Sequence, residues 1–260
     1  MKILVTNDDG INAPGIKALS NALASIADVI VIAPEKERSA IGHGITMHKP
    51  LRVNEVPWEK PINKGLAING TPADCVKLGL DALLNEPPCL VISGINWGEN
   101  LGTDVLYSGT VSGAIEGCIN GFSSIAVSLT AKKDLDFTFA AKFTKRLAQL
   151  IINHNLPAGT MLNVNIPSIP TNEIKGVVVT RLGRRRYTNT ISLRRDPRGR
   201  NYYWLAGEVE NIDQAKDTDI GAINKGYISI TPLQLDLTDH CFIKEIKNYL
   251  PFLWPDQENI

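Results

Sequence analysis

The chain has 260 residues, of which 43% are hydrophobic, and its 27 Lys and Arg residues balance 27 Asp and Glu residues. This length fits one large domain, or one domain with an extension. The composition is typical of a globular protein and excludes a disordered, collagen-like or disulfide-dense chain. Zero formal charge argues against a dedicated nucleic-acid binder or a membrane-surface protein, because both usually carry a basic excess. No apolar run approaches the ~20 residues of a membrane span, and the N-terminus does not read as a secretory signal, so we expect a cytoplasmic protein.

The first part of the chain alternates short apolar runs with helical periodicity. Residues 3–5 and 29–32 predict strands, and the apolar residues spaced three and four apart between them predict a helix. Thr71, Pro72 and Asp74 predict a helix start, with a hydroxyl cap, a proline in the first turn and a carboxylate behind it. Further strands are predicted at residues 90–92, 125–129 and 161–166, and further helices from residue 111 and over residues 139–150. This alternation is typical of a Rossmann-like, doubly wound, mostly parallel α/β sheet.

The last third has a different character. Residues 177–180 predict a strand, and the following residues 181–200 contain eight arginines together with glycine and proline breakers. We therefore divide the chain into an α/β catalytic core, residues 1–180, and a β-rich C-terminal extension, residues 181–260. Antiparallel strands are predicted near residues 202–205 and 227–230, and a short helix near residues 240–249.

The extension is too thin to bury its own large side chains. Tyr202, Tyr203 and Trp204 need a neighbour, which indicates packing against the core or a partner subunit, most simply in a two-fold dimer. An arginine run such as residues 181–200 is usually a solvent-exposed face. Two alternatives stay open: a nucleic-acid-binding role, or an approach to the substrate crevice that extends the substrate range to longer phosphorylated chains.

Polar side chains follow several predicted strands at their carboxyl ends, where such sheets bind ligands. Asp8 and Asp9 follow the first strand, Ser39 lies in the loop after the second, and Asn96 follows residues 90–92. Adjacent carboxylates remain ionised most easily beside a cation, and oxygen ligands suit Mg²⁺, Mn²⁺ or Ca²⁺. Helix capping by an aspartate, a turn asparagine and a surface serine are the structural alternatives.

A segment of small residues precedes the helix predicted from residue 111. Ser108, Gly109 and Thr110 would expose backbone N–H groups at the positive end of the helix, which favours an anion. N-capping by Thr110 is the alternative. The segment matches neither the Walker A loop nor the dinucleotide-binding fingerprint. A hard cation beside an anion cradle indicates a phosphate ester.

The cysteines and histidines add no metal motif of their own. No CxxC or HExxH pattern occurs in the sequence. We expect Cys75, Cys89, Cys118 and Cys241 to be buried, reduced thiols.

Five stretches resemble the SurE family of stationary-phase survival-protein nucleotidases. In chain order they read ILVTNDDGINAPGI, VIAPEKERSAIGHGIT, NGTPADCV, VISGINWGENLGTDVLYSGTVSGAIEG and ISITPL, and together they span most of the chain. The resemblance implies a metal-dependent phosphatase that hydrolyses nucleoside 5′- and 3′-monophosphates, and possible substrates extend to short polyphosphate. It also implies a SurE-like Rossmann core whose C-terminal extension is exchanged between the subunits of a homodimer or homotetramer.

The resemblance also assigns residues. It implies one Mg²⁺ or Mn²⁺ per subunit held by Asp8, Asp9, Ser39 and Asn96, with the two aspartates essential for catalysis. Its phosphate-binding segment matches Ser108, Gly109 and Thr110. Asn12 and His43 are weaker candidates for contacts to substrate or metal-bound water, and His43 is also a candidate general acid.

Two alternatives remain open at this point, a different catalytic mechanism and a non-catalytic function. In one, a strand-end aspartate forms an aspartyl-phosphate, as in haloacid-dehalogenase-type phosphatases, although that pattern is DxD and this chain has Asp8 and Asp9 adjacent. In the other, the protein is a non-catalytic nucleotide-binding or sensor module. The sequence does not distinguish the preferred base or sugar.

Overall fold

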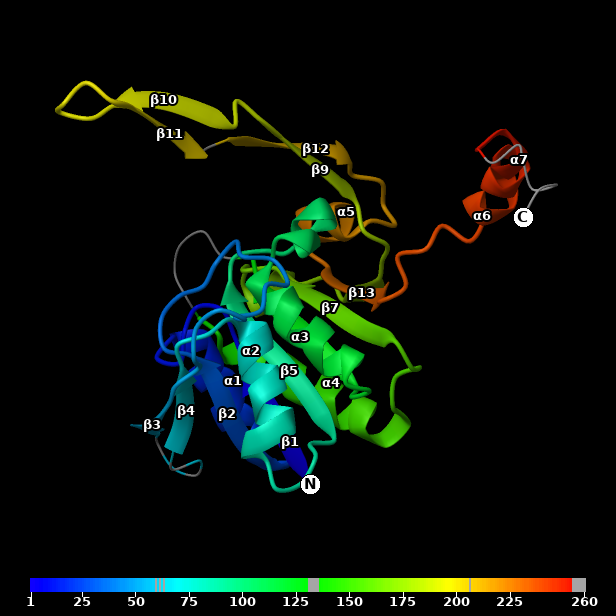
Figure 1. Cartoon of the computed structure of the whole chain (residues 1–260). Helices are drawn as coiled ribbons and strands as arrows, with labels where there is room; N and C mark the ends of the chain where they lie inside the picture. Colours follow the sequence, from blue (N-terminus) through cyan, green and yellow to red (C-terminus); the bar gives the residue numbers. More distant parts are fainter. Residues whose placement is uncertain (59, 61, 63, 131–135, 206, 254–260) are drawn as a thin grey trace, which may run out of the picture.

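The computed structural model describes residues 1–58, 60, 62, 64–130, 136–205 and 207–253. Within these residues, nine strands form one sheet that is mostly parallel (Figure 1). In their order across the sheet the strands are β3 (Val53–Pro57), β4 (Lys64–Ile68), β2 (Asp28–Pro34), β1 (Lys2–Thr6), β5 (Leu90–Trp97), β6 (Ser124–Leu129), β7 (Thr160–Ile166), β13 (Ile228–Gln234) and β8 (Val177–Val179). The predicted Rossmann-like architecture is confirmed.

Helices cover both faces of this sheet, because its central strands are apolar on both sides. Ile3 and Val5 of β1 pack in one cluster with Leu19 and Leu147, which belong to helices on one face. Leu4 points the other way and packs against Val76. The helical segments are α1 (Pro14–Leu23), α2 (Pro72–Leu78), η1 (Gly79–Leu83), η2 (Gly102–Leu106), α3 (Gly109–Ile119), α4 (Thr138–His154), η3 (Thr171–Glu173), α5 (Asp219–Asn224), α6 (Phe242–Ile246), η4 (Lys247–Tyr249) and α7 (Leu250–Leu253).

The predicted start of α2 is confirmed in detail. The Thr71 hydroxyl accepts a hydrogen bond from the Asp74 N–H at 3.0 Å, and the Asp74 carboxylate accepts one from the Thr71 N–H at 2.8 Å. Asp74 also accepts two bonds from Thr46, at 2.8 Å from its N–H and 2.6 Å from its hydroxyl. This capping box therefore fixes α2 and, through Thr46, the loop after β2.

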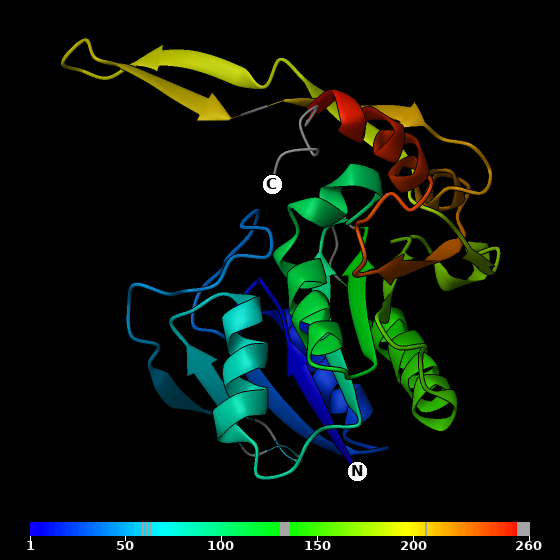
Figure 2. The same cartoon turned by 45° about the vertical axis from the view of Figure 1, so that its right-hand side comes forward.

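The extension leaves the sheet as an antiparallel arm, which we define as residues 184–205 and 207–213. β9 (Arg184–Thr188) pairs with β12 (Glu208–Asp213), and β10 (Ile191–Arg195) pairs with β11 (Asn201–Leu205). Both views show the β10–β11 hairpin reaching well beyond the core (Figures 1 and 2). Its large side chains are exposed, including Tyr203 and Trp204.

After the arm, the chain returns to the core before leaving it again. The strand expected in the extension near residues 227–230 is β13, and it lies in the main sheet between β7 and β8, antiparallel to β7. The following segment, residues 235–253, runs away from the sheet and carries α6 and α7 (Figure 1). We call this segment the tail. The short helix predicted near residues 240–249 is confirmed as α6 and η4.

Candidate active site

Three neighbouring strands present the predicted metal ligands at one edge of the sheet. β1 lies between β2 and β5 and is parallel to both, so the carboxyl ends of all three strands meet. Asp8 and Asp9 follow β1, Ser39 lies in the loop after β2, and Asn96 stands at the end of β5. The Arg38 N–H donates to the Asp8 carbonyl oxygen at 2.7 Å, which ties the loop after β2 to the end of β1.

A cavity of about 740 Å³ opens at this edge. Asp8, Ser39, Asn96 and Ser108 all line it, so the structure brings together three of the four predicted metal ligands with one residue of the predicted phosphate segment. Asp9 adjoins them, because its Oδ2 accepts the backbone N–H of the lining residue Trp97 at 3.1 Å.

Asp8 is the most deeply buried of the carboxylates that line the cavity in the described part of the chain, with 4% of its surface exposed. Burial, together with a smaller contribution from the neighbouring Asp9 carboxylate, raises the pKa of Asp8 to about 6. Hydrogen bonds from Thr110 oppose the rise, and the Thr110 hydroxyl donates to Asp8 Oδ1 at 2.5 Å. The ionised form of Asp8 is thus stabilised by uncharged hydrogen-bond donors. No cationic side chain is among these partners to compensate the buried negative charge.

The other predicted ligands are held by local contacts. Burial raises the pKa of Asp9, and the Glu37 carboxylate adds to the rise, while the Trp97 N–H lowers it. Ser39 donates its hydroxyl to Glu37 Oε1 at 2.7 Å. The Asn96 amide donates to the Gly98 carbonyl at 2.9 Å, which orients the amide group.

Three glycines let α3 lie unusually close to the sheet. A Cβ on Gly113 would come within 2.8 Å of Ser93 Oγ, and one on Gly117 within 2.5 Å of Ser124 Oγ. At the N-terminus of the helix, a Cβ on Gly109 would come within 2.8 Å of both Cβ and Oδ2 of Asp8. Glycine at these positions therefore allows the positive end of the helix to approach the buried carboxylate.

The predicted phosphate segment has a structural task as well. Ser108 Oγ accepts the Val111 N–H at 3.0 Å, so Ser108 rather than Thr110 is the N-cap of α3. Thr110 is fully buried and directs its hydroxyl to Asp8. Of the segment, Ser108 reaches the cavity.

The arm supplies the opposite wall of the cavity. The residues that form this wall were not predicted from the sequence. Tyr187, Thr190, Leu205 and Gly207 line it from the arm. The Tyr187 hydroxyl donates to Asp104 Oδ1 at 2.8 Å.

A buried arginine fastens the arm to this wall. The guanidinium of Arg185 donates to Asp104 at 2.8 Å and to Glu99 at 2.5 Å, and both carboxylates belong to lining residues. Arg185 thus approaches the crevice, but it is engaged by acidic side chains. Arg181 pairs with Asp213 and Asp217. The other arginines of residues 181–200 are exposed, as expected for a solvated face.

The charge of the cavity fits a bound cation. Among the described residues, its lining carries the carboxylates of Asp8, Glu99 and Asp104 and no Lys or Arg side chain. Glu99 and Asp104 are paired with Arg185, whereas Asp8 and the adjoining Asp9 have no cationic side chain among their stabilising partners in the described chain. A phosphate ester would be repelled by such a wall unless a cation lay between them. No group of three His, Cys, Asp or Glu side chains within the described ranges could hold a metal. A ligand set of two carboxylates with neutral Ser39 and Asn96 oxygens is consistent with that finding and suits a hard divalent ion.

The two weaker candidates lie elsewhere. His43 Nε2 lies 3.0 Å from Glu116 Oε2, and His43 lines an apolar groove on the α3 side of the molecule. Asn12 is exposed in the turn before α1. In the part of the chain that the structure describes, neither residue lines the cavity beside Asp8.

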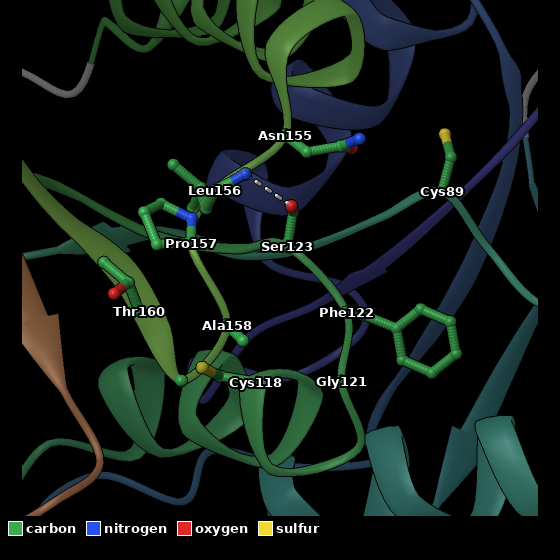
Figure 3. A pocket seen from close by; sticks show the side chains of 11 residues that line it. Cys89, Cys118, Gly121, Phe122, Ser123, Asn155, Leu156, Pro157, Ala158 and Thr160 are labelled. Atoms are coloured by element: carbon green, nitrogen blue, oxygen red, sulfur yellow. Dashed lines mark hydrogen bonds between the residues drawn. The ribbon is translucent and has the colours of Figure 1, made fainter.

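A second, smaller cavity of about 280 Å³ lies at the opposite edge, where β5, β6 and β7 begin (Figure 3). Loop backbone forms much of it, and the Leu156 N–H donates to Ser123 Oγ at 3.1 Å. Cys89 and Cys118 line it, but no carboxylate does. Burial raises the pKa of both thiols. The described lining of this cavity therefore lacks the carboxylates present at the carboxyl edge.

The four cysteines are free thiols, as expected, but their burial varies. Cys75 and Cys118 are buried, Cys89 is half-buried and Cys241 is exposed. The expectation that all four are buried was wrong for Cys241, because it lies in the tail outside the core. Among the helices of the described residues, none is long and apolar enough to span a membrane.

The chain is similar to known proteins over most of its length. The family model described as Survival protein SurE matches residues 3–189. The 5′-nucleotidase SurE of Moorella thermoacetica is 70% identical over the full length of both chains. That of Heliobacterium modesticaldum is 55% identical, covering 96% of this chain and 92% of the relative. The crystal structure of the SurE protein from Aquifex aeolicus superposes with a TM-score of 0.83 at 42% identity, covering 96% of this chain and all of that one. The chain belongs to the SurE family.

Proposed function

We infer that this protein is a phosphatase that hydrolyses nucleoside monophosphates to nucleoside and inorganic phosphate. Its full-length relatives are named 5′-nucleotidases. The observation that carries the inference is the buried, uncompensated Asp8 at the sheet edge, inside a cavity large enough for a nucleotide. The aspartyl-phosphate and sensor alternatives gain no support from these relatives.

We propose that Asp8, Asp9, Ser39 and Asn96 hold one Mg²⁺ or Mn²⁺ ion. When bound, such an ion polarises a phosphoryl oxygen and lowers the pKa of coordinated water. Asp8 is held for this task by Thr110, and Asp9 by the Trp97 N–H. Ser108, which lines the cavity at the start of α3, binds the phosphoryl oxygens, and the positive end of the helix stabilises the charge that develops there. His43 is bonded to Glu116 away from the cavity, so we assign it no contact with substrate.

A substrate panel tests this function. Purified protein is incubated with 5′-AMP, 3′-AMP, glycerol phosphate and tripolyphosphate, with Mg²⁺ or Mn²⁺ or with EDTA, and released phosphate is measured. We expect metal-dependent release from both nucleotides, with tripolyphosphate reporting on longer phosphorylated chains. Release that is unchanged in EDTA would contradict the metal site, and a trapped phospho-aspartate would favour the other mechanism.

The pKa of Asp8 predicts how metal binding depends on pH. A metal displaces the proton of a carboxylate, and the raised pKa of about 6 places that competition in an accessible range. We expect the affinity for Mn²⁺ to be constant well above pH 6 and to fall about tenfold per pH unit below it. Titration calorimetry at pH 5, 6 and 8 measures this. An affinity that is flat between pH 5 and 8 would show that Asp8 is not a ligand.

We also propose that the C-terminal extension, residues 181–260, joins subunits of a homodimer or homotetramer, while residues 1–180 carry most of the catalytic core. The tail exposes large apolar side chains, among them Phe242, Ile246 and Leu250. An apolar groove of about 1040 Å³ lies over α3, β7 and β13, lined by Val111, Ile115, Met161, Leu233 and others. An exposed apolar tail and an open apolar groove on the same chain are complementary, so exchange between two copies buries both.

Charges placed on the tail test the assembly. The double variant Phe242→Glu, Ile246→Glu is expected to elute as a monomer, because burying two carboxylates in an apolar groove costs several kcal/mol. Light scattering coupled to size exclusion gives the mass. The matched control is Lys244→Glu on the exposed helix between them, which should keep the wild-type mass. An unchanged mass for the double variant would remove the tail from the interface.

The free cysteines are in keeping with a reducing, cytoplasmic setting for this enzyme.

A further inference from the structure

An exposed tryptophan, Trp97, lines the cavity next to the proposed metal ligand Asn96. Trp97 ends β5, where it pairs in register with Leu129 of β6. It lines the cavity although 54% of its surface is exposed. Burying exposed indole surface is favourable, so a ligand that covers the Trp97 ring gains hydrophobic free energy.

The backbone fixes this indole relative to the reaction centre. The Trp97 N–H donates to Asp9 Oδ2 at 3.1 Å, and the preceding residue is Asn96. Both neighbours are in the proposed metal site, so the ring is anchored one residue away from the atoms that hold the cation. A substitution of the side chain leaves the N–H, and therefore the contact to Asp9, in place.

The cavity is far larger than a phosphate group requires. Its volume of about 740 Å³ falls in the range of pockets that enclose drug-sized ligands. Asp8, Glu99 and Asp104 supply acidic groups to the lining, and Trp97, Tyr107 and Tyr187 supply aromatic rings. The aromatic rings of this lining can contact a planar, uncharged group, whereas its carboxylates disfavour a second phosphate.

We propose that Trp97 forms the nucleobase subsite of this enzyme and binds the base by stacking, so that it discriminates nucleotides from other phosphate monoesters. This rests on the proposed function. Stacking on an aromatic ring accepts every base, since each has a π-face, and the subsite therefore selects the presence of a base rather than its identity.

Two tyrosines, Tyr107 and Tyr187, also line the cavity. The Tyr187 hydroxyl is bonded to Asp104, which orients that ring toward the arm wall. Tyr107 directly precedes the N-cap Ser108, and its backbone carbonyl accepts the Gly42 N–H at 2.9 Å, so this residue stands beside the phosphate segment. Trp97 is the ring with the largest π-face, and it stands on the strand end.

Paired substrates that differ only in the base test the proposal. 5′-AMP and ribose 5-phosphate share the sugar and the phosphate, so their kcat/KM ratio isolates the contribution of the base. In Trp97→Ala we expect kcat/KM for 5′-AMP to fall about tenfold, mainly through KM, while the value for ribose 5-phosphate stays within about twofold. Trp97→Phe should keep most of the preference for 5′-AMP, because a phenyl ring also stacks.

Binding gives a second readout that does not depend on turnover. Stacking quenches indole emission, so 5′-AMP should quench the intrinsic fluorescence of the wild type more than ribose 5-phosphate does. Trp97→Phe retains the other tryptophans, Trp58, Trp204 and Trp254, and should lose this difference.

The outcomes separate this proposal from the proposed function. An equal loss for both substrates in Trp97→Ala would make the residue a support of the metal site, and no loss for either would remove it from substrate binding. Either result overturns the base subsite. If the wild type released phosphate from no ester, the proposed function would fail, and the fluorescence difference between the two ligands would still decide for or against stacking on Trp97.

Discussion

Replacing Asp8 with asparagine is expected to reduce metal-dependent phosphate release from 5′-AMP by on the order of 10³-fold or more. The carboxylate lies at the end of β1, buried, and is one of two anionic groups in the proposed ligand set. An amide of the same shape cannot supply its charge, and the transition-state stabilisation that the cation contributes is worth several kcal/mol. Initial rates with saturating Mn²⁺ give the measurement.

Stability provides the control for this variant. Burial raises the Asp8 pKa from 3.8 to about 6, so the metal-free native state binds its proton more tightly than the unfolded chain does. The free energy of unfolding therefore falls as the pH rises from about 4 to about 6, and the full penalty persists above that range. Asparagine carries no charge, and Asp8→Asn should melt at a higher temperature than the wild type in EDTA at pH 8, with little advantage at pH 4. Wild-type turnover by this folded variant would refute the proposed site.

Replacing Gly109 with alanine should cost on the order of 10²-fold in kcat/KM. The added methyl group would sit 2.8 Å from Asp8 Cβ and Oδ2, closer than real Cβ atoms come, and at a tight 3.0 Å from the Arg38 carbonyl oxygen. Alanine favours helices over glycine by up to about 1 kcal/mol, so the loss would arise from displacement of Asp8 and not from an unstable α3. Steady-state kinetics together with a Mn²⁺ titration would show both effects.

A second glycine gives the matched control. A Cβ on Gly44 meets the Ile41 carbonyl oxygen at an ordinary 3.5 Å. Gly44→Ala should therefore retain nearly full activity and metal affinity. If Gly109→Ala behaved like Gly44→Ala, close approach of α3 to Asp8 would not be needed for function.

The sheet and the position of the site follow from local patterns in the sequence. Apolar runs and helical periods identified β1, β2, β5, β6 and β7, and the capping residues Thr71 and Asp74 identified the start of α2. These features depend on neighbouring residues alone. The rule that parallel strands end at one edge predicts that Asp8, Ser39 and Asn96 lie together, and all three line one cavity in the structure.

The far wall of the cavity could not be predicted in the same way. Tyr187 and Leu205 reach it because a buried arginine, Arg185, finds Glu99 and Asp104 more than eighty residues earlier in the chain. Periodicity carries no information about such a partner. The assignment of β13 to the extension had the same weakness, since a short apolar run does not reveal which sheet it joins.

The expectation for His43 shows a further limit. Its spacing of four residues from Ser39 suggested a shared role, but the loop between them turns at Ala40, which has a φ of 55°, and at Gly42, with a φ of 57°. These left-handed residues redirect the chain so that the imidazole meets Glu116 of α3. Backbone turns of this kind depend on contacts across the fold.

The two-sided wall has a consequence for how the enzyme is made. Its lining begins at Asp8 and ends at Gly207, so a chain still emerging from the ribosome carries the carboxylates long before it has a substrate-sized enclosure. The nascent protein can meet a cation early, yet it gains its nucleotide pocket only when the hairpin after Arg185 has been synthesised and has folded back. The enclosure is therefore complete only after residue 207 of the 260 has been added.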